Sequence, residues 1–328
     1  MKPIGTMLII LVAALCIASC AGPQIKLFSD ASDPLTESIL QGTEKGKVLI
    51  ISLRGIISTS PDDGMLRTMP SMIEEVVSQL RLAEKDMEIK CVLLKVDSPG
   101  GTATASDILY HEIMAFKQRT RAKIVVCMMD IAASGGYLVS LPADLIVAHP
   151  TTITGSVGVV FMRPNVTRLI DKIGFSMDVS KSGPNKDMGS PFRQATAEEE
   201  LILQDVTDGL ADQFINLVEK HRNLGPEALA TISTARVYLA AEAKQLGLID
   251  RVGYLDEALT QALRISGLPE NAKVIAYRRT AFPNDNLYNP LTTGTHLPAK
   301  PMLDLGIPDP TQQLSPGFYY IWTPALKL

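Results

Sequence analysis

Strand-length apolar runs alternate along this chain with stretches that carry apolar residues at helical spacing, and this alternation restricts the fold more than any other feature. The clearest runs are KVLIISLRGII (Lys47–Ile57), CVLLKV (Cys91–Val96), KIVVCMM (123–129) and DLIVA (Asp144–Ala148). The apolar periodicity between them predicts helices. Strands joined through helices pair in parallel, so we expect an α/β layered fold.

Two of the expected helices carry start signals. Ser71 with Glu74, and Thr196 with Glu199, both fit a capping box, in which each side chain bonds the backbone amide of the other residue. The first pair predicts a helix that begins after Ser71. The second predicts a long helix from about Ala197 to Arg222.

The composition is that of a globular protein. The chain has 328 residues, of which 46% are hydrophobic and 20% charged, which suits a packed core. A formal net charge of −4 gives no electrostatic reason to expect a nucleic-acid partner. No repeat with a period of about 20–50 residues is evident, so we expect a single-copy catalytic domain and not a duplicated one.

Composition also suggests domain limits. Residues 20–45 are polar and mixed and suggest a tether, residues 46–266 carry the strand and helix patterns of a catalytic domain, and residues 267–328 form a proline-rich extension. The extension ends in GFYYIWTPALKL, which holds the chain's only Trp. Such an aromatic end docks on its own subunit or on a neighbouring one, and the sequence leaves both open.

The first 20 residues have the pattern of an export signal. One lysine precedes the apolar run Met7–Ile17, which is shorter than the roughly 20 residues needed to span a bilayer. The residues IASC (17–20) end that run and resemble the lipobox of bacterial lipoproteins, in which the chain is cut before the Cys and the thiol is acylated. This resemblance implies a signal peptide over residues 1–19 and a lipid anchor at Cys20. An ordinary cleaved signal and an uncleaved anchor are the alternatives.

Two further cysteines, Cys91 and Cys127, lie inside apolar strand runs. We expect them to be buried, inert thiols. The spacing of the cysteines suits neither a metal site nor a disulfide framework, and we expect no metal or cofactor.

A lone serine among small residues marks the most informative turn. In AASGGY (132–137), two alanines precede Ser134 and two glycines follow it, directly after an apolar strand run. Glycines let another backbone or a substrate come close, and a helix N-terminus offers free N–H groups that stabilise an oxyanion. A second glycine turn, SPGG (98–101), also ends a strand, and the C-terminal ends of parallel strands share one edge. We therefore expect the two turns to meet, with Ser134 as the candidate nucleophile, although each turn alone also suits a structural role.

A serine nucleophile needs a base. The chain has four histidines: His111, His149, His221 and His296. None sits in a motif that pairs with Ser134, and we interpret all four as surface or structural residues. A lysine acts as a base only when neutral, so burial has to lower its pKa by about 3 from about 10.4. The segment SKSGPNKDMGSPF offers Lys181 and Lys186 in a loop after the strand-like FSMDVS, although a loop lysine is ordinarily solvated.

Four motifs, in their order and spacing, resemble bacterial signal peptide peptidase A: SPGG, AASGGY, GSVGVV and KSGPNKD. The similarity runs from about Lys47 to Leu259 and includes ARVYLAAEAKQLGLIDRVG. That family consists of serine peptidases with a Ser/Lys dyad. The resemblance implies a ClpP/crotonase-like layered α/β fold built from repeated β-β-α and βαβ units.

The resemblance also implies roles for particular residues. Ser134 matches the nucleophile, and Lys186 matches the general base. Ser156, in GSVG, matches the serine that hydrogen-bonds and orients that lysine. The backbone N–H groups of Gly101 and Gly135 match the oxyanion hole.

From the same resemblance we expect a membrane-associated serine endopeptidase that hydrolyses apolar peptides, such as signal peptides left after export. Single-copy members of the family imply a homo-oligomer, an octameric ring in which serine and lysine come from adjacent subunits. The lipid anchor would place the domain outside the cytoplasm, on the periplasmic face of the inner or the outer membrane.

Two other functions fit parts of the pattern. A crotonase-like acyl-CoA enzyme would use the same fold and glycine turns, but it would explain neither the Ser–Lys pair nor the export signal. A non-catalytic membrane scaffold on an inactive peptidase fold is the other alternative. The intact Ser134, Lys186 and Ser156 argue against the scaffold.

Overall fold

The main sheet joins segments from nearly the whole described chain. The computed structural model describes residues 33–64, 67–279, 287 and 317–325. The main sheet has nine strands. Seven of them follow the order β1-β13-β2-β5-β7-β8-β12, and β9 pairs with both β7 and β11. The bounds are β1 (Thr36–Gln41), β2 (Glu44–Arg54), β5 (Ile89–Ser98), β7 (Lys123–Ala133), β8 (Leu145–Ala148), β9 (Ile153–Gly155), β11 (Val237–Leu239), β12 (Arg251–Val252) and β13 (Ala272–Arg278), with a separate hairpin of β3 (Asp62–Gly64) and β4 (Arg67–Met69).

The central strands β2, β5, β7 and β8 run parallel, as the alternation of strands and helices predicts. Successive side chains of a strand point to opposite faces of the sheet. In β5, Val92, Leu94 and Val96 enter one core, whereas Cys91 and Leu93 enter a second core on the other face. Because both faces are buried, the strands are almost continuously apolar.

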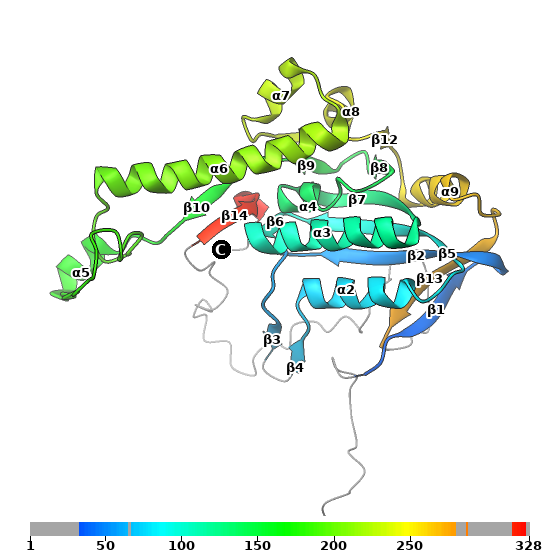
Figure 1. Ribbon diagram of the computed structural model, residues 1–328, viewed down its shortest axis with the longest axis horizontal. Helices are drawn as coiled ribbons and strands as arrows, with labels where there is room; N and C mark the ends of the chain where they lie inside the picture. Colours follow the sequence, from blue (N-terminus) through cyan, green and yellow to red (C-terminus); the bar gives the residue numbers. More distant parts are fainter. Residues whose placement is uncertain (1–32, 65–66, 280–286, 288–316, 326–328) are drawn as a thin grey trace, which may run out of the picture.

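Helices cover both faces of the sheet (Figure 1). Residues of α2, α3, α4, α6, α7 and α8 pack into the larger core, and residues of α9 pack into the smaller one. The bounds are α2 (Met72–Ala83), α3 (Ala103–Thr120), α4 (Gly135–Leu138), α5 (Thr167–Ile173), α6 (Ala197–Arg222), α7 (Pro226–Ile232), α8 (Ala240–Gln245) and α9 (Leu255–Ile265), followed near the end of the chain by a 3-10 turn at Thr323–Ala325.

Both capping boxes form where the sequence predicts them. Ser71 Oγ accepts a hydrogen bond from the backbone N–H of Glu74 (3.2 Å), and Glu74 Oε2 accepts one from the N–H of Ser71 (2.8 Å). The same reciprocal pair joins Thr196 and Glu199, at 3.1 and 2.9 Å. The predicted long helix is confirmed as α6, Ala197–Arg222.

Two strands of the main sheet lie outside the expected limits of the catalytic domain, residues 46–266. β13, beyond residue 266, lies between β1 and β2 in the main sheet. β1 lies inside the expected 20–45 tether and pairs antiparallel with β13, with Thr36 opposite Arg278. Composition reveals polar and proline-rich stretches, but it does not reveal a short strand whose partner lies more than 200 residues away.

A second sheet places the aromatic end of the chain against the second glycine turn. Its strands are β6 (Gly100–Thr102), β10 (Val160–Met162) and β14 (Gly317–Ile321), and β14 lies in the middle, antiparallel to both neighbours. The Tyr320 hydroxyl donates to Leu210 O (3.0 Å), and the Tyr320 ring packs on Phe214 with centroids 5.0 Å apart. The aromatic end therefore docks on its own subunit, one of the two options that the sequence left open.

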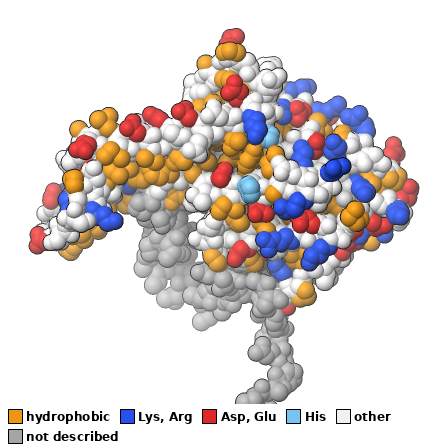
Figure 2. Space-filling model, viewed as in Figure 1, with side chains coloured by type: hydrophobic (Ala, Val, Ile, Leu, Met, Phe, Trp, Pro, Cys, Tyr) orange, Lys and Arg blue, Asp and Glu red, His pale blue; other side chains and the backbone are white. Residues whose placement is uncertain are grey.

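Residues 163–196 form an arm that extends from β10 through α5 to the start of α6 (Figure 1). Five apolar side chains on this arm are between 46% and 68% exposed: Leu169, Ile173, Phe175, Met177 and Val179. Figure 2 shows hydrophobic side chains in a band along the arm and α6. The segment FSMDVS (175–180) is not a strand here, because it pairs with no strand of the described chain.

The two thiols of the sheet are buried and free, as predicted. Burial raises the pKa of the Cys127 thiol to about 12. Neither Cys91 nor Cys127 is therefore a reactive thiolate near neutral pH.

The expected signal peptide and Cys20 lie outside the described residues. Within residues 33–64, 67–279, 287 and 317–325, none of the helices combines the length and the hydropathy of a membrane span.

Candidate active site

Ser134 stands between β7 and α4 in a backbone conformation that is rare for a residue with a side chain. Its φ is 54° and its ψ is −118°, a combination dominated by glycine. The Ser134 N–H donates to Gly155 O (2.8 Å), and the Ser134 carbonyl accepts from the N–H groups of Tyr137 and Leu138 (2.9 Å each). Strain of this kind at a strand-to-helix turn is typical of nucleophilic serines.

The hydroxyl of Ser134 is buried and unpaired. The residue is 1% exposed, and its Oγ has no hydrogen-bond partner among the described residues. An unpaired buried hydroxyl costs about 1–3 kcal/mol, so structural serines find partners. Ser140, six residues further on, does so by donating from its Oγ to Gly136 O (2.8 Å). Ser134 therefore does not serve the fold through its hydroxyl.

The histidines do not supply the missing partner within the described chain. Of the four, His296 lies outside the described residues. His221 Nε2 is bonded to the Tyr110 hydroxyl (2.8 Å), and His149 Nδ1 is bonded to Thr151 Oγ1 (2.9 Å). These contacts agree with structural roles.

The second glycine turn lies against the first, as the sequence predicts. Gly100 has a φ of +102°, and a Cβ built on it would lie 2.7 Å from Gly135 N. A Cβ on Gly101 would lie 1.8 Å from Ile57 O, so side chains are excluded from this turn. Gly135 is the first residue of α4, and its N–H therefore has no acceptor within the helix.

Ser98 joins the two turns, a role that sequence reasoning missed. Its Oγ donates to Gly55 O (2.6 Å) and accepts from the Gly100 N–H (3.1 Å). A Cβ on Gly136 would lie 2.4 Å from Ser98 O, so the turn after Ser134 rests directly on this residue. The serine of SPGG is visible in the sequence, but its role is not, because the acceptor of its hydroxyl, Gly55 O, lies 43 residues away.

Ser156 lies beside the Ser134 turn. It follows Gly155, which is paired with Ala133 across β7 and β9 and accepts the Ser134 N–H. Ser156 itself has a φ of 51° and is 8% exposed, and its N–H donates to Arg236 O (2.9 Å). The fold therefore brings Ser134, Ser156 and both glycine turns to one edge of the sheet.

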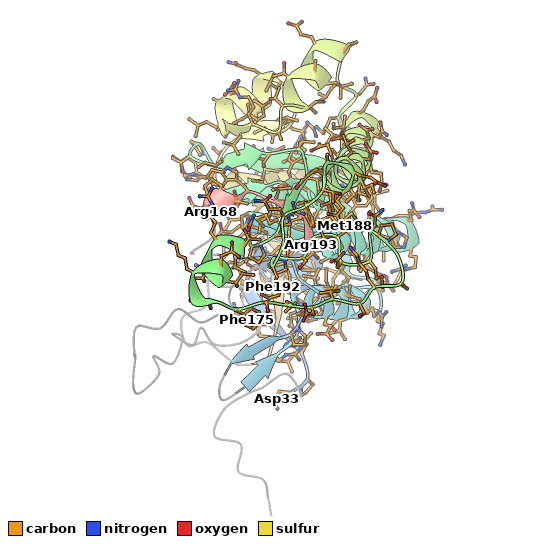
Figure 3. All side chains as sticks on the ribbon, turned by 90° about the vertical axis from the view of Figure 1, so that its left-hand side faces the viewer. Asp33, Arg168, Phe175, Met188, Phe192 and Arg193 are labelled. Carbon is orange, nitrogen blue, oxygen red and sulfur yellow. The ribbon has the colours of Figure 1, made fainter. Side chains whose placement is uncertain are left out.

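Lys186 is not brought to that edge by its own chain. It is exposed in the arm between α5 and α6, and its side chain makes no hydrogen bond or ion pair with a described residue. Figure 3 looks onto this arm, where Met188 and Arg193 lie above Phe192 and Phe175. In Figure 1 the arm and α4 lie at opposite ends of the sheet that contains β14.

Lys181, the other lysine of this loop, is bound by its own loop. Its Nζ donates to Asp187 Oδ1 (2.7 Å) and to Pro184 O (2.8 Å). Lys181 is thus held by Asp187, whereas the Lys186 side chain makes no hydrogen bond or ion pair with a described residue.

β14 lies along the edge of the second glycine turn. Tyr320 is opposite Gly101 in the antiparallel pairing, and the Trp322 N–H donates to Pro99 O (2.9 Å). The Tyr320 carbonyl oxygen would lie 2.0 Å from a Cβ on Gly100. An extended peptide segment with a carbonyl beside the glycine turns is thus already in place there.

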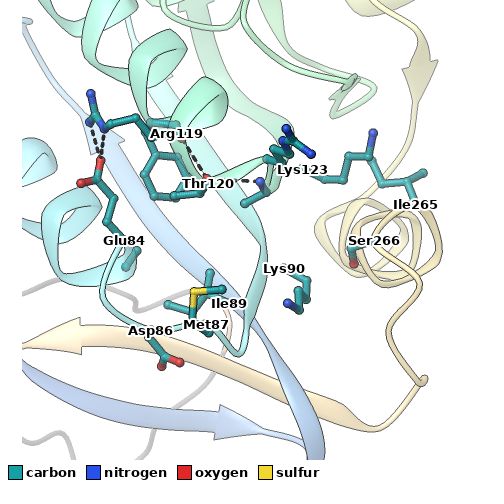
Figure 4. A pocket seen from close by; sticks show the side chains of 14 residues that line it. Glu84, Asp86, Met87, Ile89, Lys90, Arg119, Thr120, Lys123, Ile265 and Ser266 are labelled. Atoms are coloured by element: carbon teal, nitrogen blue, oxygen red, sulfur yellow. Dashed lines mark hydrogen bonds and ion pairs between the residues drawn. The ribbon is translucent and has the colours of Figure 1, made fainter.

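A surface pocket of about 490 Å³ lies away from these residues (Figure 4). Its lining includes Ile89 and Lys123, where β5 and β7 begin, and the ion-paired Glu84 and Arg119. Ser98 and Ser134 stand at the other ends of those strands. The pocket therefore lies at the edge of the sheet opposite the candidate active site.

The described residues include no group of three or more His, Cys, Asp or Glu side chains arranged to hold a metal ion.

Comparison with known proteins gives consistent matches. The sequence model of peptidase family S49 matches residues 116–268, which include Ser134, Ser156 and Lys186. An Enterococcus faecium protein assigned as a signal peptide peptidase SppA is 31% identical over 253 residues, which are 77% of this chain and 73% of the relative. Protease 4 of Haemophilus influenzae is 31% identical over 88% of this chain and 46% of its own length. The chloroplastic serine protease SPPA of Arabidopsis thaliana is 31% identical over 71% of this chain and 35% of its own length.

The sequence model of Clp protease matches residues 67–148, which contain both glycine turns. Together with the parallel sheet and its covering helices, this match confirms the expected ClpP/crotonase-like α/β fold. A solved structure of a ClpP1 mutant from Listeria monocytogenes covers 65% of this chain and 94% of its own, with a TM-score of 0.41 and 17% identity.

Proposed function

This chain belongs to peptidase family S49 and is a serine-type peptidase, and we propose from that premise that it is a membrane-anchored endopeptidase with a Ser134–Lys186 dyad. The observation that carries the proposal is the Ser134 hydroxyl, which is buried, unpaired and held in a strained turn. A fold tolerates such a group where the chemistry uses it.

In the proposed reaction, the neutral amine of Lys186 takes the proton of Ser134 Oγ as this oxygen attacks the peptide carbonyl. The N–H groups of Gly101 and Gly135 stabilise the resulting oxyanion. The Lys186 ammonium then protonates the leaving amine, and an acyl-enzyme remains. Lys186 next removes a proton from the attacking water, and this proton returns to Ser134 Oγ when the ester breaks. The hydroxyl of Ser156 orients the amine.

The lysine of each site comes, in this proposal, from a second copy of the chain in a ring, for which we expect eight subunits. Two observations, one on the arm and one at Ser134, support this assignment. Phe175, Met177 and Val179 alternate with polar residues and are exposed, the pattern of a half-buried strand without a partner. The Ser134 hydroxyl has no partner from its own described chain. Contact between two neighbouring copies would cover the arm of one copy and, at the same time, bring its Lys186 to Ser134 of the other.

The proposed substrates are extended, apolar peptides, among them signal peptides left in the membrane after export. The name of the Enterococcus faecium relative supports this substrate class. Acylation of Cys20 would hold the enzyme outside the cytoplasm, on the periplasmic face of the inner or the outer membrane. Several acyl chains make such an anchor firm.

The proposal is tested by separate Ser134→Ala and Lys186→Ala variants of the full chain. Each should lose peptide cleavage by at least about a thousandfold while it still folds and assembles, since the dyad acts as a unit. Lys172→Ala is the matched control, because Lys172 lies on α5 of the same arm and makes no ion pair with a described residue. Normal turnover of an internally quenched apolar peptide by either dyad variant would refute the assignment.

A further inference from the structure

The loop that carries Lys186 has little backbone structure of its own. Three single turns follow one another, in which the N–H groups of Lys186, Met188 and Ser190 donate to the carbonyls three residues earlier at 3.0–3.2 Å. Neither a helix nor a strand contains these residues. Side-chain contacts therefore have to hold the loop in position.

Asp187, the residue after Lys186, is the centre of those contacts. Arg193 binds its carboxylate with two parallel hydrogen bonds, Nε to Oδ2 at 2.8 Å and Nη2 to Oδ1 at 2.7 Å. Lys181 Nζ donates to Oδ1 as well, at 2.7 Å. A bidentate arginine is the most strongly directional partner of a carboxylate. Arg193 and then Lys181 hold the pKa of Asp187 well below its usual range.

Arg193 connects this carboxylate to the first turn of α6. Its Nη1 donates to Glu199 Oε2 at 2.8 Å, and its Nη2 also contacts Glu199 Oε1. Glu199 is buried and closes the capping box with Thr196. Its hydrogen bond with Arg193 lowers the pKa of Glu199 to about 2. The side chains of Lys181, Asp187, Arg193 and Glu199 are linked in that order into a chain of two cations and two anions.

The other charged groups of the arm stay out of this network. They are Arg168, Asp171 and Lys172 on α5, Asp178 and Lys186 on the loop, Glu198 and Glu200 on α6, and Arg163 before α5, which pairs with Glu200. None of them forms a described ion pair with Asp187. The carboxylate adjacent to Lys186 is thus occupied by Arg193 and Lys181, and the Lys186 amine is left without a counter-ion.

We infer that Arg193 and Lys181 are positioning residues that fix the Lys186 turn and withhold the Asp187 carboxylate from the Lys186 amine. The inference rests on the proposed function, in which Lys186 is the base. A carboxylate within reach of an amine favours the ammonium form, which cannot take a proton. With both oxygens of Asp187 occupied by Arg193 and Lys181, the amine enters the active site without the carboxylate of the adjacent residue.

The test is the pH profile of kcat/KM for an internally quenched apolar peptide, measured on the assembled full chain. Arg193→Gln removes the bidentate partner of Asp187 and leaves only Lys181 on its Oδ1, so the acidic limb should move to higher pH by about one unit, the smallest shift expected from a nearby opposite charge. Adding Asp187→Asn to that variant removes the freed carboxylate and should return the limb to its original position. Arg193→Lys keeps a cation and should move the limb less than Arg193→Gln.

Lys181→Gln provides a second measurement that leaves Arg193 and the start of α6 intact, so it serves if Arg193→Gln does not assemble. It should move the limb in the same direction by a smaller amount. A loss of kcat/KM by the same factor at every pH, unchanged by adding Asp187→Asn, would show that the network only supports the fold and would overturn the inference. Turnover by Lys186→Ala would instead refute the proposed function, so the two failures are distinguishable.

Discussion

At Ser134 the side chain and the backbone have opposite requirements. The proposed chemistry needs a hydroxyl, whereas a φ of 54° with a ψ of −118° suits a residue without a Cβ. The strain is maintained by neighbours: Gly155 O receives the Ser134 N–H, and the turn that follows rests on Ser98 through Gly136. Strained residues of this kind cost on the order of 1–3 kcal/mol and persist where the surroundings determine their conformation.

The strain predicts an unusual order of stabilities at this position. Ser134→Gly should be more stable than Ser134→Ala by about 1 kcal/mol, because glycine adopts this conformation without a Cβ clash. Both variants should be inactive. Urea unfolding of the two variants measures the difference. An alanine variant at least as stable as the glycine variant would show that the conformation is not strained.

At the scale of elements, β14 has an arrangement that a purely structural strand does not require. It lies between β10 and β6 and follows the edge of the turn that carries Gly101. Two aromatic contacts hold it, Phe318 on Phe161 at 4.7 Å between centroids and Tyr320 on Phe214 at 5.0 Å. An extended substrate that reached Ser134 by strand pairing would need this same edge.

If β14 and an extended substrate compete for the edge of β6, deletion of residues 317–328 should increase the cleavage of added peptides, because it exposes that edge. We expect kcat/KM for an apolar peptide to rise several-fold, mainly through a lower KM. Tyr320→Phe is the control, because it removes only the hydrogen bond to Leu210 O and keeps the strand. If the truncated chain is folded by circular dichroism but cleaves no faster than the control, β14 does not cover the substrate edge.

At the scale of the whole molecule, the arm and the edge of the sheet that carries the glycine turns each lack a partner. The edge has a buried serine without a partner, and the arm has exposed apolar side chains and a lysine without a partner. A contiguous exposed apolar surface of this kind is typical of an interaction site. A heterologous contact that closes into a ring would satisfy both in every copy.

Shared sites predict that two inactive variants restore each other. Ser134→Ala and Lys186→Ala chains, mixed in equal amounts, unfolded and reassembled, should recover about one quarter of the wild-type rate per site, because one junction in four pairs an intact serine with an intact lysine. Each variant treated alone should remain inactive. A mixture as inactive as its components would place both residues of the dyad in one chain.

The predictions from sequence succeeded where the signals are local. Ser71 and Thr196 marked two helix starts because a capping box involves residues only three positions apart. The meeting of the SPGG and AASGGY turns followed from a general property of parallel strands. β13 was missed, because it gains its place beside β2 from residues more than 200 positions away, and Ser98 was missed, because its acceptor Gly55 lies on another segment.

The sequence by itself therefore determined the layered α/β architecture, the helix starts, the family resemblance and the candidate residues, since each depends on residue types at short spacings. Only the tertiary structure decided that the Ser134 hydroxyl is buried and unpaired, that β14 lies along the edge of Gly101, and that Lys186 is exposed and makes no hydrogen bond to the serine of its own chain. The physical reason is that burial and strand pairing join distant segments. Their outcome depends on the packing of the whole core and not on any motif.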